Sequence, residues 1–556
     1  MKKITFKTFH YLGFGIYNDL RCRLPYYISD FKDAYNYRVI PSTTFVFFTN
    51  LLPAIAFAQD MFDKTNQAYG VNEVLLSTAI AGVVFGLFSG QPLCIVGVTG
   101  PISIFSYTVY ELIEPRGTPY FPFMCWIYLW SMVFHLIIAV GNFVSFLKII
   151  SSFSCEVFGF FICFVYIQKG IQILGRQFDA IDLASGYCSV MIAILMVVFG
   201  IGSYVFGNNL HYFKHWIRKI FVDYGVAVAV VFFTGFIHFG GKLDETDLAR
   251  LPITKSFQPT YSGSDRSHGW FVHFWPGENI AVADVFLAIP FAILLTFLFY
   301  FDHNVSSLMC QPKEYPLKKP SSFHWDFALL GITTGVAGLI GIPPPNGLIP
   351  QAPLHTQSLL VHNKHGQVLS VVEQRVTNTA QGLITFIMMS RPFLIVLGLI
   401  PQAVLAGLFF IMGITGLHGN VVTNKIRYLF LDKEYIENDE SCEQIFKDIH
   451  KLENKKWFYV YLLLQVIAAM AEFGITCTKG AVGFPGVLMF FALCAKWVWP
   501  WIIPREELDK LDGEVADENI IRNLDISQAI RKDKDKDWDS DNKSGSEEVV
   551  TSEEIF

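Results

Sequence analysis

Charge is scarce in this sequence. Asp, Glu, Lys and Arg make up 16% of its 556 residues, whereas hydrophobic residues make up 52% and phenylalanine alone accounts for 53. Soluble globular domains carry about 25% charged residues. So low a share of charge, beside so much apolar surface, excludes a water-soluble globular protein and predicts a polytopic membrane protein.

The patterns of metal sites and of hydrolytic enzymes are also absent. The ten cysteines form no C-x-x-C pair and stand mostly in apolar runs, where cysteine acts as a small hydrophobic residue. His211 and His215 have i,i+4 spacing, but no carboxylate stands near them, and the sequence has no H-E-x-x-H motif. We therefore expect no metal, no cofactor and no enzyme activity.

Long apolar runs recur along the chain. A membrane-spanning helix needs about 20 mostly apolar residues, and windows of that kind indicate fourteen segments. We therefore expect an all-α polytopic transmembrane domain over residues 41–503. The expected segments are 41–60, 74–90, 91–111, 122–147, 152–168, 186–206, 220–240, 280–301, 325–342, 343–361, 378–398, 401–419, 457–476 and 480–503.

The two ends of the chain are polar. Residues 1–40 are too few for a sizeable soluble domain, and residues 504–556 are rich in Asp, Glu, Lys and Ser, which bury too little apolar surface to fold alone. We expect a cytoplasmic N-terminal segment and a disordered acidic cytoplasmic tail. With the N-terminus inside, most Lys and Arg outside the segments fall on the cytoplasmic side, as the positive-inside rule requires.

Two of the expected segments are interrupted by Pro and Gly. The third reads GQPLCIVGVTGPISIFSYTV, Gly90 to Val109, and the tenth contains GIPPPNGLIPQAPLHTQ, Gly341 to Gln357. If the fourteen segments are divided into two consecutive sets of seven, each interrupted segment is the third of its set. Broken segments at matching positions of two halves are typical of inverted-repeat transporters, whose binding site lies near the middle of the membrane. Non-helical backbone at that depth requires surrounding protein or a water-filled cavity, so the breaks predict a cavity.

Each break is expected to start a half-helix. Pro101 and Pro350 suit the first turn of a helix. The amide hydrogen that proline lacks would have no partner within the helix at that position. The free amides and the helix dipole at such a start attract an oxyanion or an oxygen-rich neutral acid. The alternative is that both sites are ordinary proline kinks. The candidate binding residues are Thr99, Gly100, Pro101, Ile102, Pro350 and Gln351.

One carboxylate follows a long apolar run. Asp302 comes after AIPFAILLTFLFYF and before Val305, Leu308 and Met309, so the eighth segment can carry it into the membrane. Acids inside spanning helices are functional candidates, because the bilayer penalises an unpaired charge by several kcal/mol. Ser306 stands one turn further and could share its face. The alternative is an ordinary polar residue at the cytoplasmic end of the helix.

These residues lie in a string with a specific resemblance. The string is DHNVSSLMCQPKEYPLKKPSSFHWDFALLGITTGVAGLIGIPPPNGLIPQAPLHTQSL, followed by EQRVTNTAQG and IPQAVLAGLFFIMGITGL. It resembles the anion-exchanger and bicarbonate-transporter family, in particular its fungal borate efflux transporters. The resemblance covers roughly residues 1–505.

The resemblance implies an architecture and an activity. It implies fourteen segments in a seven-plus-seven inverted repeat, with segments 1–4 and 8–11 as a core domain and segments 5–7 and 12–14 as a gate domain. It further implies a homodimer formed through the gate domains, and export of borate or boric acid across the plasma membrane by alternating access. No nucleic-acid partner is expected. Protons, sodium or no ion remain alternatives for coupling.

The substrate inference depends on Gln351. The animal anion exchangers carry an arginine at the matching position, and a fixed guanidinium suits a permanent anion. An uncharged amide suits boric acid, which is neutral near pH 7 and becomes tetrahedral borate by adding hydroxide. The alternatives are a bicarbonate or other inorganic anion exchanger, a nucleobase or sulfate permease of the same architecture, a membrane enzyme and a channel.

Overall fold

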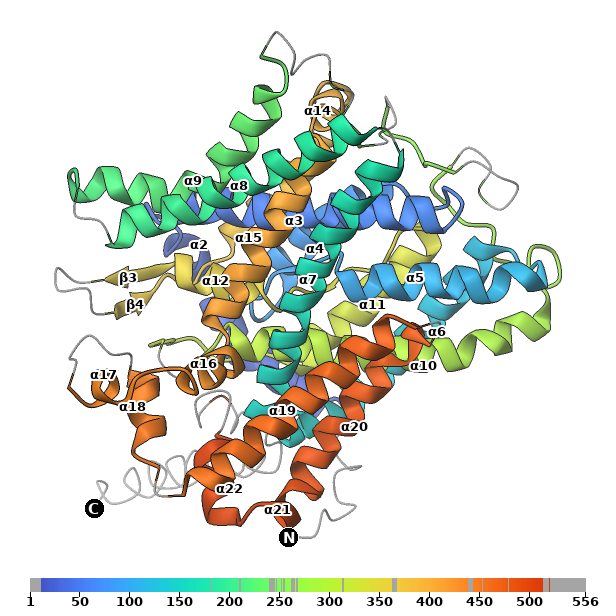
Figure 1. The fold of residues 1–556 in the computed structure, drawn as a ribbon. Helices are drawn as coiled ribbons and strands as arrows, with labels where there is room; N and C mark the ends of the chain where they lie inside the picture. The colour runs from blue at the N-terminus through green and yellow to red at the C-terminus, as the bar shows by residue number, and fades with distance from the viewer. Residues whose placement is uncertain are drawn as a thin grey trace, which may run out of the picture.

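The computed structural model describes most of the chain. It covers residues 12–513 and residue 520, apart from 181, 210–211, 240–245, 247, 252, 254–255, 262–265, 267–268, 313–314, 363–367, 439–443, 453 and 479. The fold is almost entirely helical, with two small two-stranded sheets (Figure 1).

Long apolar helices make up the body of the molecule. Among the described residues, nine helices are long and apolar enough to cross a membrane. They are α3 (Val39–Lys64), α4 (Val71–Phe88), α6 (Tyr120–Val140), α7 (Ser152–Ala180), α8 (Leu183–Asn209), α9 (His215–Phe236), α10 (Val282–Met309), α15 (Gln402–Gly419) and α19 (Lys455–Thr476). The structure thus has the architecture of a helical polytopic membrane protein.

Several expected segments are shorter or bent. Helices α13 (Val376–Met388) and α14 (Arg391–Leu397) meet at 93° and would together form a tenth span. Helices α11 (His324–Ile340) and α20 (Phe484–Trp497) are apolar but fall below the length of a full span. Helix length and composition therefore establish nine or ten spans within the described part of the chain, and they do not establish fourteen.

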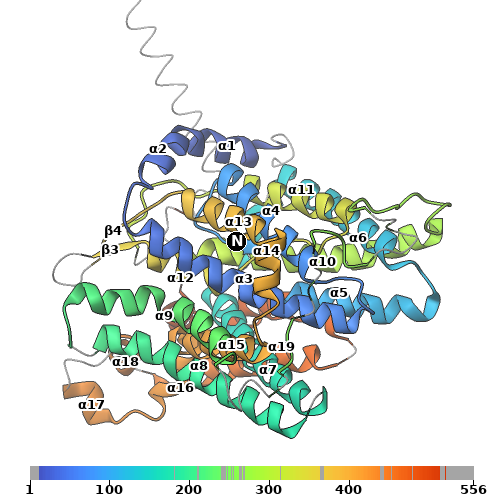
Figure 2. The ribbon, with the colours of Figure 1, turned by 90° about the horizontal axis from the view of Figure 1, so that it is seen from above.

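The two interrupted segments pair with each other. Strand β1 (Val96–Gly97) runs antiparallel to β2 (Asn346–Gly347), and each strand precedes a helix, α5 (Gly100–Ile113) or α12 (Gln351–Ser358). In Figure 1 and Figure 2, α5 and α12 lie on opposite sides of the centre of the molecule. Part of the backbone hydrogen bonding of each break is thus supplied by the other break, and such pairing within the protein is what irregular backbone inside a membrane requires.

The helices pack in two groups. Helices α3, α4, α5, α6, α10, α11, α12 and α13 contact mainly one another, and so do α7, α8, α9, α15, α19 and α20. Figure 2 shows the first set in the upper half of the view and the second in the lower half. We name them the α3 group and the α7 group.

The remaining elements are short and connect or flank these helices. They are α1 (Phe14–Arg23), η2 (Leu24–Tyr26), α2 (Tyr27–Lys32), η3 (Glu114–Arg116), η4 (Phe143–Ile149), β3 (Leu360–His362), β4 (Val368–Val371), α16 (Val421–Tyr428), α17 (Lys433–Asn438), α18 (Gln444–His450), η6 (Ala481–Gly483), α21 (Trp499–Ile502) and α22 (Arg505–Leu511).

The segment before α3 is fixed to the α3 group by a buried carboxylate. Asp30 is fully buried and contacts three cations: Arg375 at 2.7 Å, Lys319 at 2.7 Å and Arg23 at 3.3 Å. Burial lowers the pKa of the Arg23 guanidinium from its ordinary value, and the Asp30 carboxylate opposes that shift. Arg375 also donates to the carbonyl of Ser89 at 2.7 Å. One acid thus joins three distant parts of the chain.

The structure describes the segment after the last apolar helix continuously as far as residue 513. Helix α22 buries Leu508, and Oδ1 of Asp512 accepts hydrogen bonds from the Phe153 amide at 2.8 Å and the Tyr461 hydroxyl at 3.3 Å. Asp512 therefore caps the start of α7. These residues fall within the expected disordered tail of 504–556, so any disordered tail begins later. Residues 514–519 and 521–556 lie outside the described residues.

Asp30→Asn should destabilise the protein strongly. Removing one partner of a buried ion pair costs about 3–5 kcal/mol, and here three cations lose their shared anion. We expect the midpoint of thermal unfolding of the detergent-purified protein to fall clearly. Asp33→Asn is the control, because Asp33 also contacts Lys319 but its side chain is 50% exposed. Equal midpoints for the two variants would contradict the central role of Asp30.

Two truncations should behave differently. Removing residues 521–556, which keeps Ile520 against the hydrophobic core, should leave the unfolding midpoint and the activity per folded molecule unchanged. Removing residues 505–556 also deletes the α7 cap and the buried Leu508, which together are worth about 2–4 kcal/mol. Thermal unfolding of both purified truncations beside the full chain measures the difference. If the two truncations unfold together, α22 contributes nothing to the α7 group.

Candidate functional site

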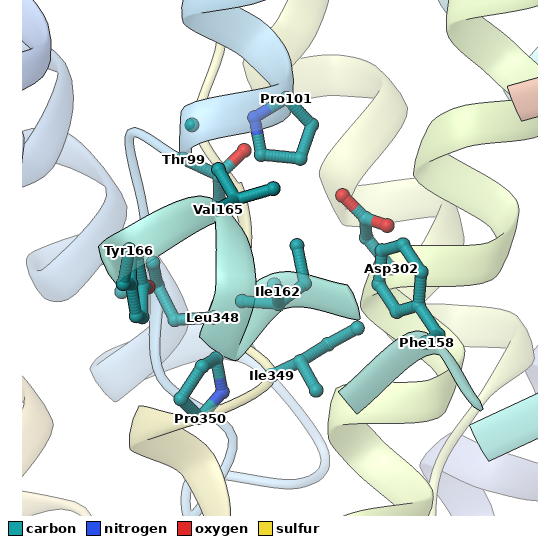
Figure 3. A pocket seen from close by; sticks show the side chains of 12 residues that line it. Thr99, Pro101, Phe158, Ile162, Val165, Tyr166, Asp302, Leu348, Ile349 and Pro350 are labelled. Atoms are coloured by element: carbon teal, nitrogen blue, oxygen red, sulfur yellow. The ribbon is translucent and has the colours of Figure 1, made fainter. Parts of the chain in front are cut away.

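A cavity lies where the two breaks meet the α7 group (Figure 3). The space between its lining atoms is about 320 Å³ with open solvent included, and about 20 Å³ of it is wide enough for the centre of a water molecule. Its wall comes from the start of α5, the chain leading into α12, one residue of α10 and one face of α7. The lining residues are Thr99, Gly100, Pro101, Phe158, Ile162, Val165, Tyr166, Asp302, Gly347, Leu348, Ile349 and Pro350.

The start of α5 presents a capped helix end to this cavity. Thr99 is extended, with φ −108° and ψ 160°, and its hydroxyl accepts a hydrogen bond from the Ile102 amide at 3.4 Å. Pro101 occupies the first turn. A Cβ on Gly100 would lie 3.0 Å from the Phe57 ring, so only glycine fits here without a shift. Ile102 is fully buried and does not line the cavity.

The start of α12 faces the same space. Pro350 precedes the first helical residue, Gln351, and Pro350 lines the cavity whereas Gln351 does not. The Gln351 side chain is buried, and its Nε2 donates to the carbonyl of Thr49 at 3.2 Å. The amide of Gln351 thus stands behind the cavity wall and ties α12 to α3.

Asp302 contributes the carboxyl group of the wall. It lies within α10, two turns before the helix ends at Met309, and is 2% exposed. Oδ2 accepts a hydrogen bond from Asn346 at 3.0 Å, and Oδ1 has no hydrogen-bond partner among the described residues. Figure 3 shows the carboxylate directed toward the space below Pro101. A hydrogen-bond acceptor is therefore free to meet a ligand in the cavity.

Ser306 lies one turn beyond Asp302 but does not line the cavity. It is fully buried beside strand β2, where a Cβ on Gly347 would lie 3.0 Å from its Oγ. Of the eight residues proposed from the sequence, the cavity thus brings together Thr99, Gly100, Pro101, Pro350 and Asp302. It leaves Ile102, Ser306 and Gln351 in the packing behind the wall.

The apolar wall from α7 was not anticipated. Phe158, Ile162, Val165 and Tyr166 recur at helical spacing and form one face of α7. In the sequence this stripe lies inside a continuous apolar run, where a cavity wall, a packed face and a lipid-facing surface have the same composition. Tyr166 is the one residue of this face with a polar group, its hydroxyl. The centre of its ring lies 5.7 Å from that of Phe409.

The site combines donors, one acceptor and an apolar side. The beginnings of two half-helices supply the positive end of a helix dipole, and Asp302 supplies an acceptor. Among the described residues that line the cavity, none is Lys, Arg or His. Such a site suits a small ligand that both donates and accepts hydrogen bonds, such as a neutral oxygen-rich acid.

The sequence matches a known family and several curated proteins. The family model of the HCO3⁻ transporter integral membrane domain matches residues 10–187 and 183–516. The chain is 52% identical to Boron transporter 1 of Saccharomyces cerevisiae, over 94% of this chain and 89% of that protein. It is 47% identical to a putative transporter of Schizosaccharomyces pombe, over 92% and 98% of the two chains. It is also 26% identical to the human Band 3 anion transport protein, over 90% of this chain and 56% of that protein.

Gly347→Ala should distort the site. A Cβ at this position would lie 2.7 Å from the Cα of His303 and 3.0 Å from the carbonyl oxygen of Asp302, so strand β2 would have to move away from α10. Overpacking of this kind costs about 1–3 kcal/mol. The thermal unfolding midpoint of the purified variant should therefore fall, whereas Gly175→Ala, which meets no atom within 4 Å, should not lower it, because alanine is the better helix former. An unshifted midpoint for Gly347→Ala would mean that β2 does not pack tightly on α10.

Proposed function

The chain belongs to the HCO3⁻ transporter family, and on this premise we propose that it exports boric acid or borate by alternating access. Membership makes the protein a membrane transporter and not an enzyme. The choice of boron draws on the 52% identity to a protein named as a boron transporter and on the chemistry of the cavity.

The free oxygen of Asp302 carries the proposal. Boric acid has three hydroxyl groups, and each can donate one hydrogen bond and accept others. A hydroxyl donated to Oδ1 of Asp302 would satisfy the unpaired acceptor, while the remaining oxygens face the starts of α5 and α12. A ligand that only accepts hydrogen bonds would leave that carboxylate oxygen unpaired, at a cost of about 1–3 kcal/mol or more.

The absence of a cation among the described lining residues favours a neutral acid over a permanent anion. The described lining offers a chloride or bicarbonate ion no guanidinium or ammonium to balance its charge. Gln351, which stands where the animal anion exchangers carry arginine, offers only an amide and directs it to Thr49. Exchange of bicarbonate or another inorganic anion is the alternative function, followed by transport of a nucleobase or sulfate.

Alternating access would move the two helix groups against each other. In this proposal the α3 group is the core domain, the α7 group is the gate domain, and the fourteen segments form a seven-plus-seven inverted repeat. The pairing of β1 with β2 between the two breaks supports the repeat, because matching segments of two inverted halves meet at the middle of the membrane. We further propose a plasma-membrane homodimer formed through the gate domains, with both termini in the cytoplasm.

Flux measurements in proteoliposomes test the substrate. The purified protein should accelerate the loss of boric acid from loaded vesicles, and external bicarbonate, chloride and uracil should compete poorly. A pH indicator inside the vesicles would report whether protons move with boron. Fast exchange of bicarbonate or chloride without boron flux would replace the proposal by its alternative.

Asp302→Asn should reduce boron flux at least about tenfold. The substitution keeps the volume but replaces a carboxyl group, which can release its proton, by an amide, which cannot, and leaving a buried polar group without its partner costs about 1–3 kcal/mol. Flux per folded molecule in proteoliposomes measures the effect. Asp284→Asn is the control, because Asp284 lies at the start of the same helix beside the exposed Arg116. Normal flux through Asp302→Asn would remove the carboxylate from the binding site.

A further inference from the structure

A cluster of four charged side chains, two of them buried, joins the two helix groups. Lys169 on α7 contacts Oδ2 of Asp60 on α3 at 2.5 Å, and Arg176 on α7 contacts Oδ1 of the same carboxylate at 2.9 Å. Arg176 also contacts Asp63 at 2.8 Å. The side chains of Lys169 and Asp60 are only 5% and 4% exposed. Each ion pair runs from one helix group to the other.

The cluster continues the cavity wall along α7. Tyr166 lines the cavity, and Lys169 and Arg176 follow it at spacings of three and ten residues, which keeps all three on one side of the helix. Nζ of Lys169 also lies 5.8 Å from the centre of the Tyr107 ring on α5. The cations therefore stand between the cavity and the ends of α3 and α7.

We propose that Asp60, Asp63, Lys169 and Arg176 form an ionic latch that closes the cavity toward the ends of α3 and α7, and that these pairs separate when substrate leaves on that side. The inference rests on the proposed alternating access, because it needs the α7 group to move against the α3 group. In the proposed topology this end is extracellular.

The chemistry of the cluster suits reversible closure. Charges removed from water need good geometry and several hydrogen bonds to offset their desolvation, and the doubly contacted Asp60 provides both. When the groups separate, water can enter and solvate each charge, so opening regains much of what the broken pairs lose. An apolar seal of the same area would expose its surface without such compensation.

Cysteine labelling from outside the cell measures the latch. The parent carries Ile162→Cys as a reporter in the cavity and Cys477→Ser, which removes an exposed native thiol. A membrane-impermeant, negatively charged methanethiosulfonate is applied to intact cells. Asp60→Asn and Lys169→Met should each raise the labelling rate of residue 162 at least about tenfold. They change the local charge in opposite directions, so a rise in both reports opening and not attraction of the reagent.

Matched controls separate the latch from a general loosening. Arg116→Gln should label like the parent, because Arg116 pairs with Asp284 of α10 at 3.5 Å and both residues lie in the part of the chain that forms the α3 group. A double variant that carries both Asp60→Lys and Lys169→Asp swaps the two charges. Its labelling rate at residue 162 should return to within about threefold of the parent. If Asp60→Asn fails to fold, Lys169→Met and Arg176→Gln carry the test.

The outcomes distinguish the latch from the transport proposal. Parental labelling rates in both Asp60→Asn and Lys169→Met would overturn the latch even if boron flux is normal. Raised rates in a protein that moves no boron would retain the latch and reject the substrate. An equal rise in the Arg116→Gln control would also overturn the latch, since the ion pair of Arg116 with Asp284 does not link the two groups.

Discussion

The pairing of β1 with β2 is the interaction on which the rest of the structure depends. Four residues, Val96, Gly97, Asn346 and Gly347, hold two interrupted segments together across more than two hundred residues of sequence. Backbone groups left unpaired at this depth would each cost several kcal/mol. Because each break supplies part of the other's hydrogen bonding, α5 and α12 can begin at the centre of the molecule and direct their amide ends into one cavity.

Sequence reasoning predicted the polar half of the site and missed its apolar half. Thr99, Pro101, Pro350 and Asp302 break local rules: prolines inside apolar segments and a carboxylate inside a helix are costly unless something compensates them. Residues that break such rules can be recognised in a single amino-acid sequence. The α7 residues Phe158 and Ile162 break no rule, since an apolar side chain in an apolar helix is expected everywhere, and only the three-dimensional packing distinguishes a cavity wall.

Position along the chain was easier to predict than direction of a side chain. Gln351 starts α12 next to the lining Pro350, yet its amide turns back to the carbonyl of Thr49. Ser306 follows Asp302 by one helical turn and packs against β2 instead. Similarly, the ordered α22 could not be recognised among charged residues, because its binding depends on Asp512 finding an amide of α7, a partner that no local pattern reveals.

The cap that Asp512 places on α7 also sets an order of assembly. Phe153 leaves the ribosome early, and its partner Asp512 follows 359 residues later. Chains fold from the N-terminus during synthesis at about 5–20 residues per second, so α7 waits from about twenty seconds to more than a minute with its first turn uncapped. The helix that forms one wall of the cavity therefore receives this cap only after almost all of the described chain has been made.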